Sequence, residues 1–223
     1  MRNIIMTISL CIIAATLHAQ IPFQDNNGKY GLKDNDDNII FQGKYDHIDT
    51  FSTEGLAVVR SGLKYGFIDK TGKEIIPPEY SIASGFSEGL AAVAVFEGNE
   101  IIWRYIDATG REAIVCNRKG IFAYPFSGGF ARILLKDENK WGLIDKAGKE
   151  LVPPKYDEIG DFSEGMAAVK LNDKYGYIDT TGKEVIQCKY NYAGPFRLGG
   201  GLVMTSDNKM LHVDKTGKEH SGE

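Results

Sequence analysis

The segment Lys140–Tyr156, KWGLIDKAGKELVPPKY, recurs in close copies from one end of the chain to the other. Lys64–Tyr80 and Lys174–Tyr190 repeat it without gaps, and Lys29–Tyr45 keeps its length with a changed sequence. Every copy, including a last one that breaks off after its turn, places an aspartate at the same point: Asp34, Asp69, Asp107, Asp145, Asp179 and Asp214. Successive aspartates are 34 to 38 residues apart. A period of this length indicates stacked supersecondary units.

Each unit is predicted to be a three-stranded antiparallel meander. Residues in Trp141–Asp145 alternate with period two, and their aromatic and β-branched content is typical of a strand. In the turn that follows, the aspartate side chain accepts a backbone N–H two residues on, and the glycine at the fourth place supplies a positive φ. The second strand ends at paired prolines such as Pro77–Pro78, which mark a sheet edge or an exit. An Ala- and Val-rich third strand, such as Leu90–Val95, follows a Phe-Ser-Glu-Gly motif.

Such units must cover one another, because a single sheet leaves one face in water. Aromatic pairs such as Tyr65 and Phe67 are predicted to fill the space between neighbours, and the glycine between them lets a backbone come close. We therefore predict an all-β fold: a tandem array of about six three-stranded meander repeats that forms an open or loosely closed superhelix, as a single domain over residues 20–219 with a tail at 220–223. A closed, propeller-like ring is the alternative.

The repeated pattern of an aromatic residue, Gly, any residue, Ile, Asp, two residues, Gly, Lys and Glu resembles the WG repeat, also called the KWG repeat. The resemblance covers nearly all of the chain after residue 28. It implies an all-β repeat protein of a largely uncharacterised, mostly bacterial family thought to serve in interactions, and it brings no catalytic residues. The third unit departs most, since Arg104 occupies the place of the glycine. This unit is either specialised or decayed.

The first 19 residues are predicted to be a secretory signal peptide. Arg2 precedes an apolar run from Ile4 to Leu17, and the small residue Ala19 offers a cleavage site. The run is shorter than the roughly 20 residues of a spanning helix, so no integral membrane segment is expected after cleavage. Cys11 raises a lipoprotein alternative, which Leu10 before it disfavours. We expect an exported protein, either periplasmic or extracellular.

Composition and motifs favour a noncatalytic protein. With 26 basic and 30 acidic residues, a net charge of −4, the chain has no evident basic face for nucleic acid. The aspartates have turns to cap, whereas calcium requires six to eight converging oxygens. The Ser-Glu-Gly motifs lack the surroundings of a hydrolase serine, and the few histidines are scattered. We expect no catalytic residues, no metal and no cofactor.

Two cysteines occupy equivalent positions two units apart. Cys116 and Cys188 each lie four residues after the glutamate of the repeat, in the place that Pro78 and Pro154 hold elsewhere. A disulfide needs Cα atoms within about 7 Å, which is less than two unit spacings. We predict two free, buried thiols.

Binding residues are sought where the repeats differ. The distance from the aspartate to the tyrosine of the repeat is 11 residues in four units, whereas the distance from the later phenylalanine to the next aspartate varies from 17 to 21. Repeat arrays often place binding loops on such a face, although tolerated surface insertions would look the same. The candidate binding residues in or beside these loops are Glu97, Asn99, Glu100, Trp103, Arg104, Tyr105, Asp137, Glu138, Asn139, Asn172 and Asp173.

Two hypotheses for the function follow. The first is a scaffold that binds a protein partner, with its large aromatic rings buried and its binding loops polar. The alternative is a module that binds cell-wall material or another glycan through exposed rings of Trp103, Tyr105 or Trp141.

Overall fold

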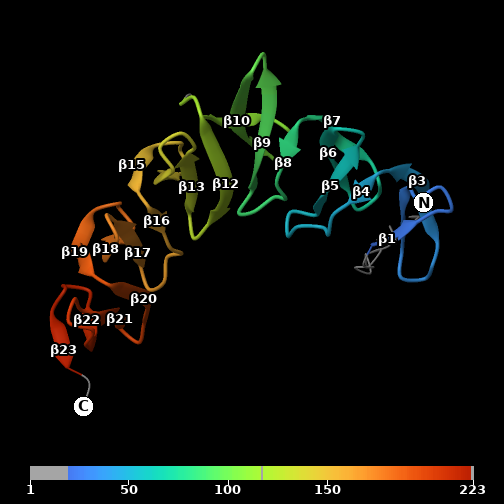
Figure 1. Ribbon diagram of the computed structural model, residues 1–223. Coiled ribbons are helices and arrows are strands. Elements are labelled where there is room, and N and C mark those ends of the chain that lie inside the picture. The colour runs from blue at the N-terminus through green and yellow to red at the C-terminus, as the bar shows by residue number, and fades with distance from the viewer. Residues whose placement is uncertain (1–19, 117, 222–223) are drawn as a thin grey trace, which may run out of the picture.

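The computed structural model describes residues 20–116 and 118–221. The predicted signal peptide and the last two residues of the predicted tail lie outside this part. The described residues form 23 strands in six antiparallel sheets, and they contain no helix that is long and apolar enough to cross a membrane. The sheets follow one another along an open arc with well-separated ends (Figure 1). The predicted all-β tandem array is confirmed.

We name the sheets A to F in chain order. Sheet A holds β1 (Ile21–Gln24), β2 (Tyr30–Lys33) and β3 (Ile39–Tyr45); sheet B holds β4 (His47–Ile48), β5 (Leu56–Ser61), β6 (Lys64–Asp69) and β7 (Glu74–Tyr80); sheet C holds β8 (Ile82–Ala83), β9 (Leu90–Glu97), β10 (Glu100–Asp107) and β11 (Glu112–Val115). Sheet D holds β12 (Ile121–Ser127), β13 (Phe130–Leu135), β14 (Lys140–Asp145) and β15 (Glu150–Tyr156); sheet E holds β16 (Glu158–Ile159), β17 (Met166–Leu171), β18 (Lys174–Asp179) and β19 (Glu184–Tyr190); sheet F holds β20 (Tyr192–Arg197), β21 (Gly200–Met204), β22 (Met210–Asp214) and β23 (Glu219–Ser221).

Five sheets have four strands each, one more than the predicted meander, and the strands are paired across the predicted unit boundaries. The predicted third strand, for example β9, pairs with the first strand of the next unit, β10. The connection from the tyrosine to the phenylalanine supplies the fourth strand, such as β16, on the concave side of the arc (Figure 1). The chain leaves each sheet by its outer strand and crosses to the inner edge of the next, so every complete repeat is shared between two sheets.

The aspartate turns form as the sequence predicts. In Asp179–Lys183, Asp179 Oδ1 accepts the N–H of Thr181 at 2.8 Å and of Lys183 at 3.2 Å, and the Thr181 hydroxyl donates to the same oxygen. Gly182 takes a φ of 82°. Because the aspartate satisfies the donors of its own turn, it acts as a cap.

The glycine beside the aromatic residue is required by a bulge in the outer strand. A Cβ on Gly142 would lie 2.6 Å from the carbonyl oxygen of Val152, where β15 bulges over β14. In the third unit β11 pairs with β10 without this bulge, and Arg104 lies opposite Val115. The arginine and a short outer strand that lacks the bulge at this position therefore occur together.

The core consists of apolar layers between neighbouring sheets, as the stacking argument predicts. Phe67, Tyr105 and Tyr177 are fully buried in these layers. Cys116 and Cys188 are free, as predicted, and they are half-buried. Burial raises the pKa of each of these two thiols to about 11.

Candidate binding surface

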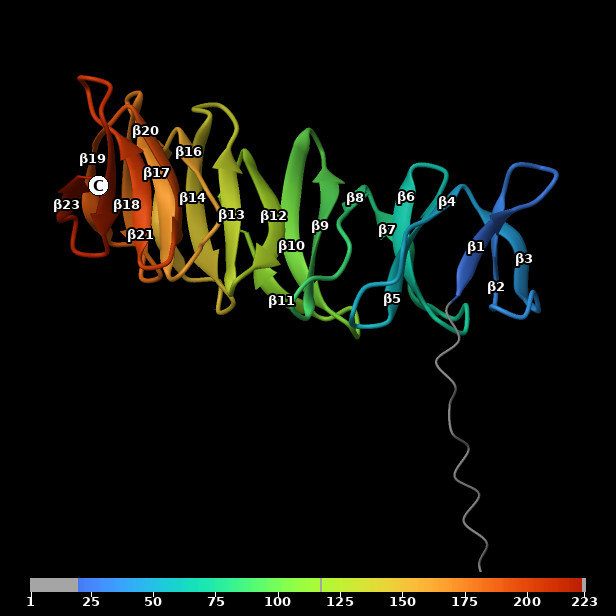
Figure 2. The same ribbon diagram turned by 90° about the horizontal axis from the view of Figure 1, so that it is seen from below.

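The loops of variable length are the tips of the central hairpins, and they lie along one edge of the array, which we call the hairpin edge. It carries the turns β5–β6, β9–β10, β13–β14, β17–β18 and β21–β22, along the top of Figure 2. The aspartate turns and the Ser-Glu-Gly loops lie along the opposite edge. The β9–β10 hairpin is the longest, with eight residues in each strand, and it rises above its neighbours in Figure 1.

Three of the candidate residues come together between sheets C and D. Asn99, Glu100 and Asp137 line a hollow of about 400 Å³ between the β9–β10 and β13–β14 hairpins. Lys119, from the crossing between the two sheets, places its Nζ 2.6 Å from Glu100 Oε1. Lys136 Nζ lies 5.8 Å from the ring centre of Phe122 in the same hollow. The hollow thus offers charges of both signs beside an aromatic ring.

Glu97 and Arg104 stabilise the long hairpin. Arg104 Nη2 lies 3.0 Å from Glu97 Oε1, and its Nε lies 3.1 Å from Glu112 Oε2. The arginine is half-buried and bridges the two neighbouring strands of its own sheet. In the third unit an ion-paired arginine therefore replaces the close backbone packing that glycine allows in the others.

Trp103 and Tyr105 must be removed from the candidate surface. Both side chains are buried in the layer between sheets C and D, where Trp103 packs 6.0 Å from the Phe122 ring. The Tyr105 hydroxyl donates to the carbonyl oxygen of Tyr124 at 2.7 Å, and burial raises the pKa of Tyr105. Alternation along β10 points both rings toward sheet D, so neither presents a face to a ligand.

The remaining candidates are turn residues. Asn139, Asn172 and Asp173 all have positive φ, and the pair Asn172–Asp173 forms the two-residue turn that joins β17 to β18. Turns of this kind favour Asn and Asp for backbone reasons alone. Glu138 lies exposed on the β13–β14 tip beside Asn139. Turn geometry explains these residue types.

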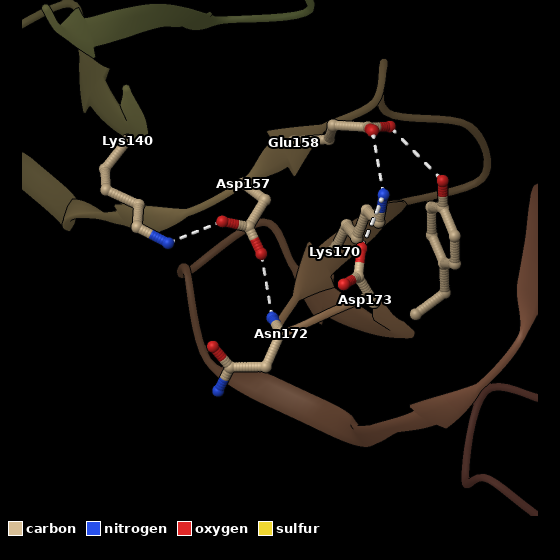
Figure 3. A network of polar contacts seen from close by, with 7 residues as sticks. Lys140, Asp157, Glu158, Lys170, Asn172 and Asp173 are labelled. Atoms are coloured by element: carbon tan, nitrogen blue, oxygen red, sulfur yellow. Dashed lines mark hydrogen bonds and ion pairs between the residues drawn. The ribbon is translucent and has the colours of Figure 1, made fainter. Parts of the chain in front are cut away.

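A polar network holds the β17–β18 turn against the crossing from sheet D to sheet E (Figure 3). Asp157 accepts the N–H of Asn172 at 2.7 Å and pairs with Lys140. The Lys140 ammonium and the Asn172 amide hold the pKa of Asp157 below its ordinary value. Lys170 bridges Asp173 at 3.3 Å and Glu158 at 3.5 Å. This network is separate from the hollow between sheets C and D.

The hairpin edge also carries an apolar part that the pattern of the repeats did not indicate. Leu63 is 89% exposed at the β5–β6 tip and Phe96 is 59% exposed at the end of β9. Both line a hollow of about 460 Å³ between sheets B and C, together with Tyr65. The sequence feature that could have indicated this apolar surface is Leu63, which lies at the tip of a turn between Gly62 and Lys64, where a polar residue is usual.

Taken together, these side chains can contact a partner, donate and accept hydrogen bonds, and pair with charges. Within the described ranges, no three His, Cys, Asp or Glu side chains gather in a way that would hold a metal ion.

The fold and this edge define an all-β repeat protein built from propeller-like antiparallel sheets along an open arc. The chain belongs to the family of proteins with the WG containing repeat, whose model matches residues 30–64, 65–95, 141–175 and 175–205, more than half of the chain. The matched stretches leave out residues 96–140, which contain the divergent third unit. No curated protein matches the chain.

Solved structures resemble the chain at low sequence identity. A eukaryotic initiation factor is 12% identical with a TM-score of 0.50, and the match covers 91% of this chain and 62% of that one. This chain thus spans less than two thirds of the factor's length, and the likeness concerns the fold alone. A protein of unknown function from Bacteroides caccae is 13% identical over 91% of this chain and 92% of that one, with a TM-score of 0.36. The WD40 β-propeller domain of Doa1 is 10% identical, covering 91% and 78%, with a TM-score of 0.37.

Proposed function

We propose that the protein is an exported, noncatalytic scaffold that binds a protein partner through the hairpin edge of sheets B, C and D. The observation that carries this proposal is the pair of exposed apolar side chains, Leu63 and Phe96, around one hollow. Adjacent apolar side chains on a surface are characteristic of interaction sites, especially when polar residues surround them.

The neighbouring hollow supplies the polar part of the same surface. Glu100 and Lys119 form an exposed ion pair there, and Asn99 and Asp137 line the same hollow. Rim charges of this kind influence specificity and the rate of association more than affinity. Leu63 and Phe96 are therefore the expected anchors, and the charges between sheets C and D select the partner.

The test is chemical cross-linking of the mature protein, residues 20–223, in envelope and culture-medium fractions of the native organism, followed by mass spectrometry. A double variant, Leu63→Asp with Phe96→Asp, places two charges in the apolar hollow and is expected to lower capture of the partner at least tenfold. Leu198→Asp is the matched control, because Leu198 is fully exposed at the other edge of sheet F. Equal capture of the partner by the unchanged protein, the double variant and Leu198→Asp would show that the surface is wrongly assigned. Cross-links away from the hairpin edge would show the same.

The glycan alternative retains one observation in its favour. Tyr124 is 37% exposed, and its ring centre lies 5.1 Å from that of the half-buried Trp141. A Trp103→Phe variant makes Trp141 the only tryptophan, so its fluorescence reports on this pair. Soluble cell-wall glycans that shield Trp141 from iodide would favour the alternative, whereas unchanged quenching would leave the protein partner as the better hypothesis.

A further inference from the structure

Four of the five junctions between neighbouring sheets are filled by the same side chain. The last residue of the outer strand is a tyrosine that inserts its ring between its own sheet and the next: Tyr45, Tyr80, Tyr156 and Tyr190. All four rings are buried. At three of these junctions the hydroxyl donates to the first glutamate of the next outer strand, as Tyr190 does to Glu219 at 2.7 Å.

The junction between sheets C and D lacks this ring. Tyr80 lies six residues after Glu74, and the residue six after Glu112 is Arg118. Arg118 is exposed, and it reaches outward to Glu150, whose two carboxylate oxygens lie 3.3 Å from its Nη2. Glu150 is the counterpart of Glu219 at this junction.

A cavity of about 210 Å³ lies where the tyrosine ring would be. The ring of Tyr156 packs in a cluster with Val152, Ile159, Val169 and Ile178. The residues at the same positions of the repeat between sheets C and D are Ile114, Ile121, Ile133 and Ile144. All four line the cavity. The walls of a tyrosine site are thus present around a centre that none of the side chains in residues 20–116 and 118–221 fills.

The exposure of one wall residue supports this equivalence. Ile144 is 5% exposed, whereas its counterparts beneath the four tyrosines, Ile68, Ile106, Ile178 and Val213, are each 0% exposed. The bottom of the cavity is therefore reached from the surface.

The polar end of the cavity also carries charged groups like those that contact a tyrosine hydroxyl at the other junctions. At the junction of sheets A and B, Glu74 accepts hydrogen bonds from both Lys44 Nζ, at 2.8 Å, and the Tyr45 hydroxyl, at 2.6 Å. Between sheets C and D the carboxylate of Glu150 and the cation of Arg118 are both present. A phenol hydroxyl completes the set of groups that the chain assembles elsewhere.

We propose that the cavity between sheets C and D binds the phenol ring of a tyrosine side chain presented by a partner polypeptide, with the hydroxyl donating to Glu150. The phenol chemistry follows from the four internal examples. The polypeptide source rests on the proposed function, and it agrees with the position of the cavity beside β11, the outermost strand of sheet C. A partner would complete the junction as the chain's own tyrosines complete the others.

The experiment uses the mature protein and follows ligand binding by saturation-transfer NMR with p-cresol, toluene and N-acetyl-tyrosinamide. We expect p-cresol and N-acetyl-tyrosinamide to bind saturably. Toluene should bind about tenfold more weakly, because it lacks the hydrogen bond to a charged acceptor. The control variant is Arg118→Tyr, which fills the cavity with the chain's own ring and is expected to abolish the binding of all three.

A second readout does not depend on the variant. Cys116 lines the cavity, and Cys188 holds the equivalent place at a junction that Tyr190 fills. Saturating p-cresol should slow the alkylation of Cys116 at least threefold and leave the rate at Cys188 unchanged.

Absence of p-cresol binding, or equal protection of both cysteines, would overturn the phenol site. Binding of p-cresol without binding of N-acetyl-tyrosinamide would overturn the polypeptide source and point to free phenols. These outcomes are distinguishable from a failure of the proposed function, since partner capture through Leu63 and Phe96 is measured on a different edge.

Discussion

The two junctions on either side of sheet D are each altered, but in different layers. The junction of sheets C and D has lost the outer tyrosine, which leaves a cavity in the apolar layer. The junction of sheets D and E keeps Tyr156 but has lost a polar clasp on the opposite edge. The two junctions therefore distinguish the contribution of a buried ring in the apolar layer from that of polar contacts between neighbouring sheets.

The clasp is formed by the Phe-Ser-Glu-Gly motif. Between sheets E and F, the Glu164 carboxylate accepts the N–H of Leu198 at 2.7 Å and of Gly199 at 2.9 Å, and the Ser163 hydroxyl donates to the carbonyl of Phe196. In sheet D the motif reads Phe-Ser-Gly-Gly, so Gly128 stands where the glutamate would be.

Other contacts join sheets D and E at this place. Arg132 Nη1 donates to the carbonyl of Ile159 at 3.1 Å, and the rings of Phe130 and Phe162 lie 4.7 Å apart. The hollow beside them is about 50 Å³, far smaller than the cavity between sheets C and D. A lost clasp exposes a backbone amide to water, whereas a lost ring removes apolar contacts that no neighbour replaces.

The largest expected effect is on the tyrosine layer. Tyr156→Ala should lower the free energy of unfolding by about 3–5 kcal/mol, because it removes a fully buried ring and leaves a cavity. Arg118→Ala at the equivalent position should cost less than about 1 kcal/mol, since its exposed ion pair contributes little. Urea titrations of both variants check this. Similar losses in the two would mean that Arg118 supports its junction as the tyrosines do.

The next effect concerns the glycine beside the aromatic residue. Gly142→Ala should destabilise the protein by about 1–3 kcal/mol, because the new Cβ meets the Val152 carbonyl at 2.6 Å. Arg104→Ala should cost about 1 kcal/mol, through the lost ion pairs to Glu97 and Glu112 and not through a clash.

Thermal unfolding of the two variants measures the difference, and a crystal structure of Gly142→Ala should show β15 displaced from β14. A tolerated alanine at Gly142 would indicate that the bulge is not what excludes a side chain there.

Much of the fold is predictable because its determinants are local. The aspartate and the glycine of positive φ fix each turn within a few residues. The paired prolines correctly marked β7 and β15 as edge strands, but both strands continue past the prolines to the tyrosine instead of ending there. Strand pairing across the predicted boundary was not predictable from the pattern, because it depends on where the chain crosses after the tyrosine. The tyrosine and the phenylalanine at the two ends of that crossing both pack in the core: Tyr156 is buried, and Phe162 packs against the same core cluster.

The candidate site was predicted in part. Loop length singled out the hairpin edge, and three of its candidates, Asn99, Glu100 and Asp137, share a hollow there. Trp103 and Tyr105 were candidates as exposed rings only under the glycan hypothesis, and their burial agrees with the packing of aromatic pairs that the repeat predicts. Arg118 was missed although its position follows from a count of six residues after Glu112. A substitution is informative only once the role of the residue it replaces is known.

The smallest effect is the repair of the missing clasp. Gly128→Glu is expected to raise the free energy of unfolding by less than about 1 kcal/mol. The new carboxylate accepts a hydrogen bond from the Gly165 amide, but a glutamate at the positive φ of this position costs part of that gain. Glu88 and Glu164 tolerate this conformation, with φ of 54° and 52°. Exchange of the Gly165 amide should slow at least several-fold.

The pH dependence identifies the source of any gain from that repair. Burial by itself would raise the pKa of Glu88, but Lys146 and the Gly129 amide outweigh burial and lower it below the ordinary value of a glutamate. A group whose folded-state pKa is lowered stabilises the protein above its unfolded-state pKa, and this contribution is lost as the pH falls through the folded-state value. In Gly128→Glu the Gly165 amide would act on the new carboxylate without a lysine, because Thr180 holds the place of Lys146 in sheet E. Any gain should therefore be small at neutral pH and smaller still near pH 3. A gain that persists in acid would come from packing of the new side chain or from the unfolded state, and it would leave the clasp without an energetic role.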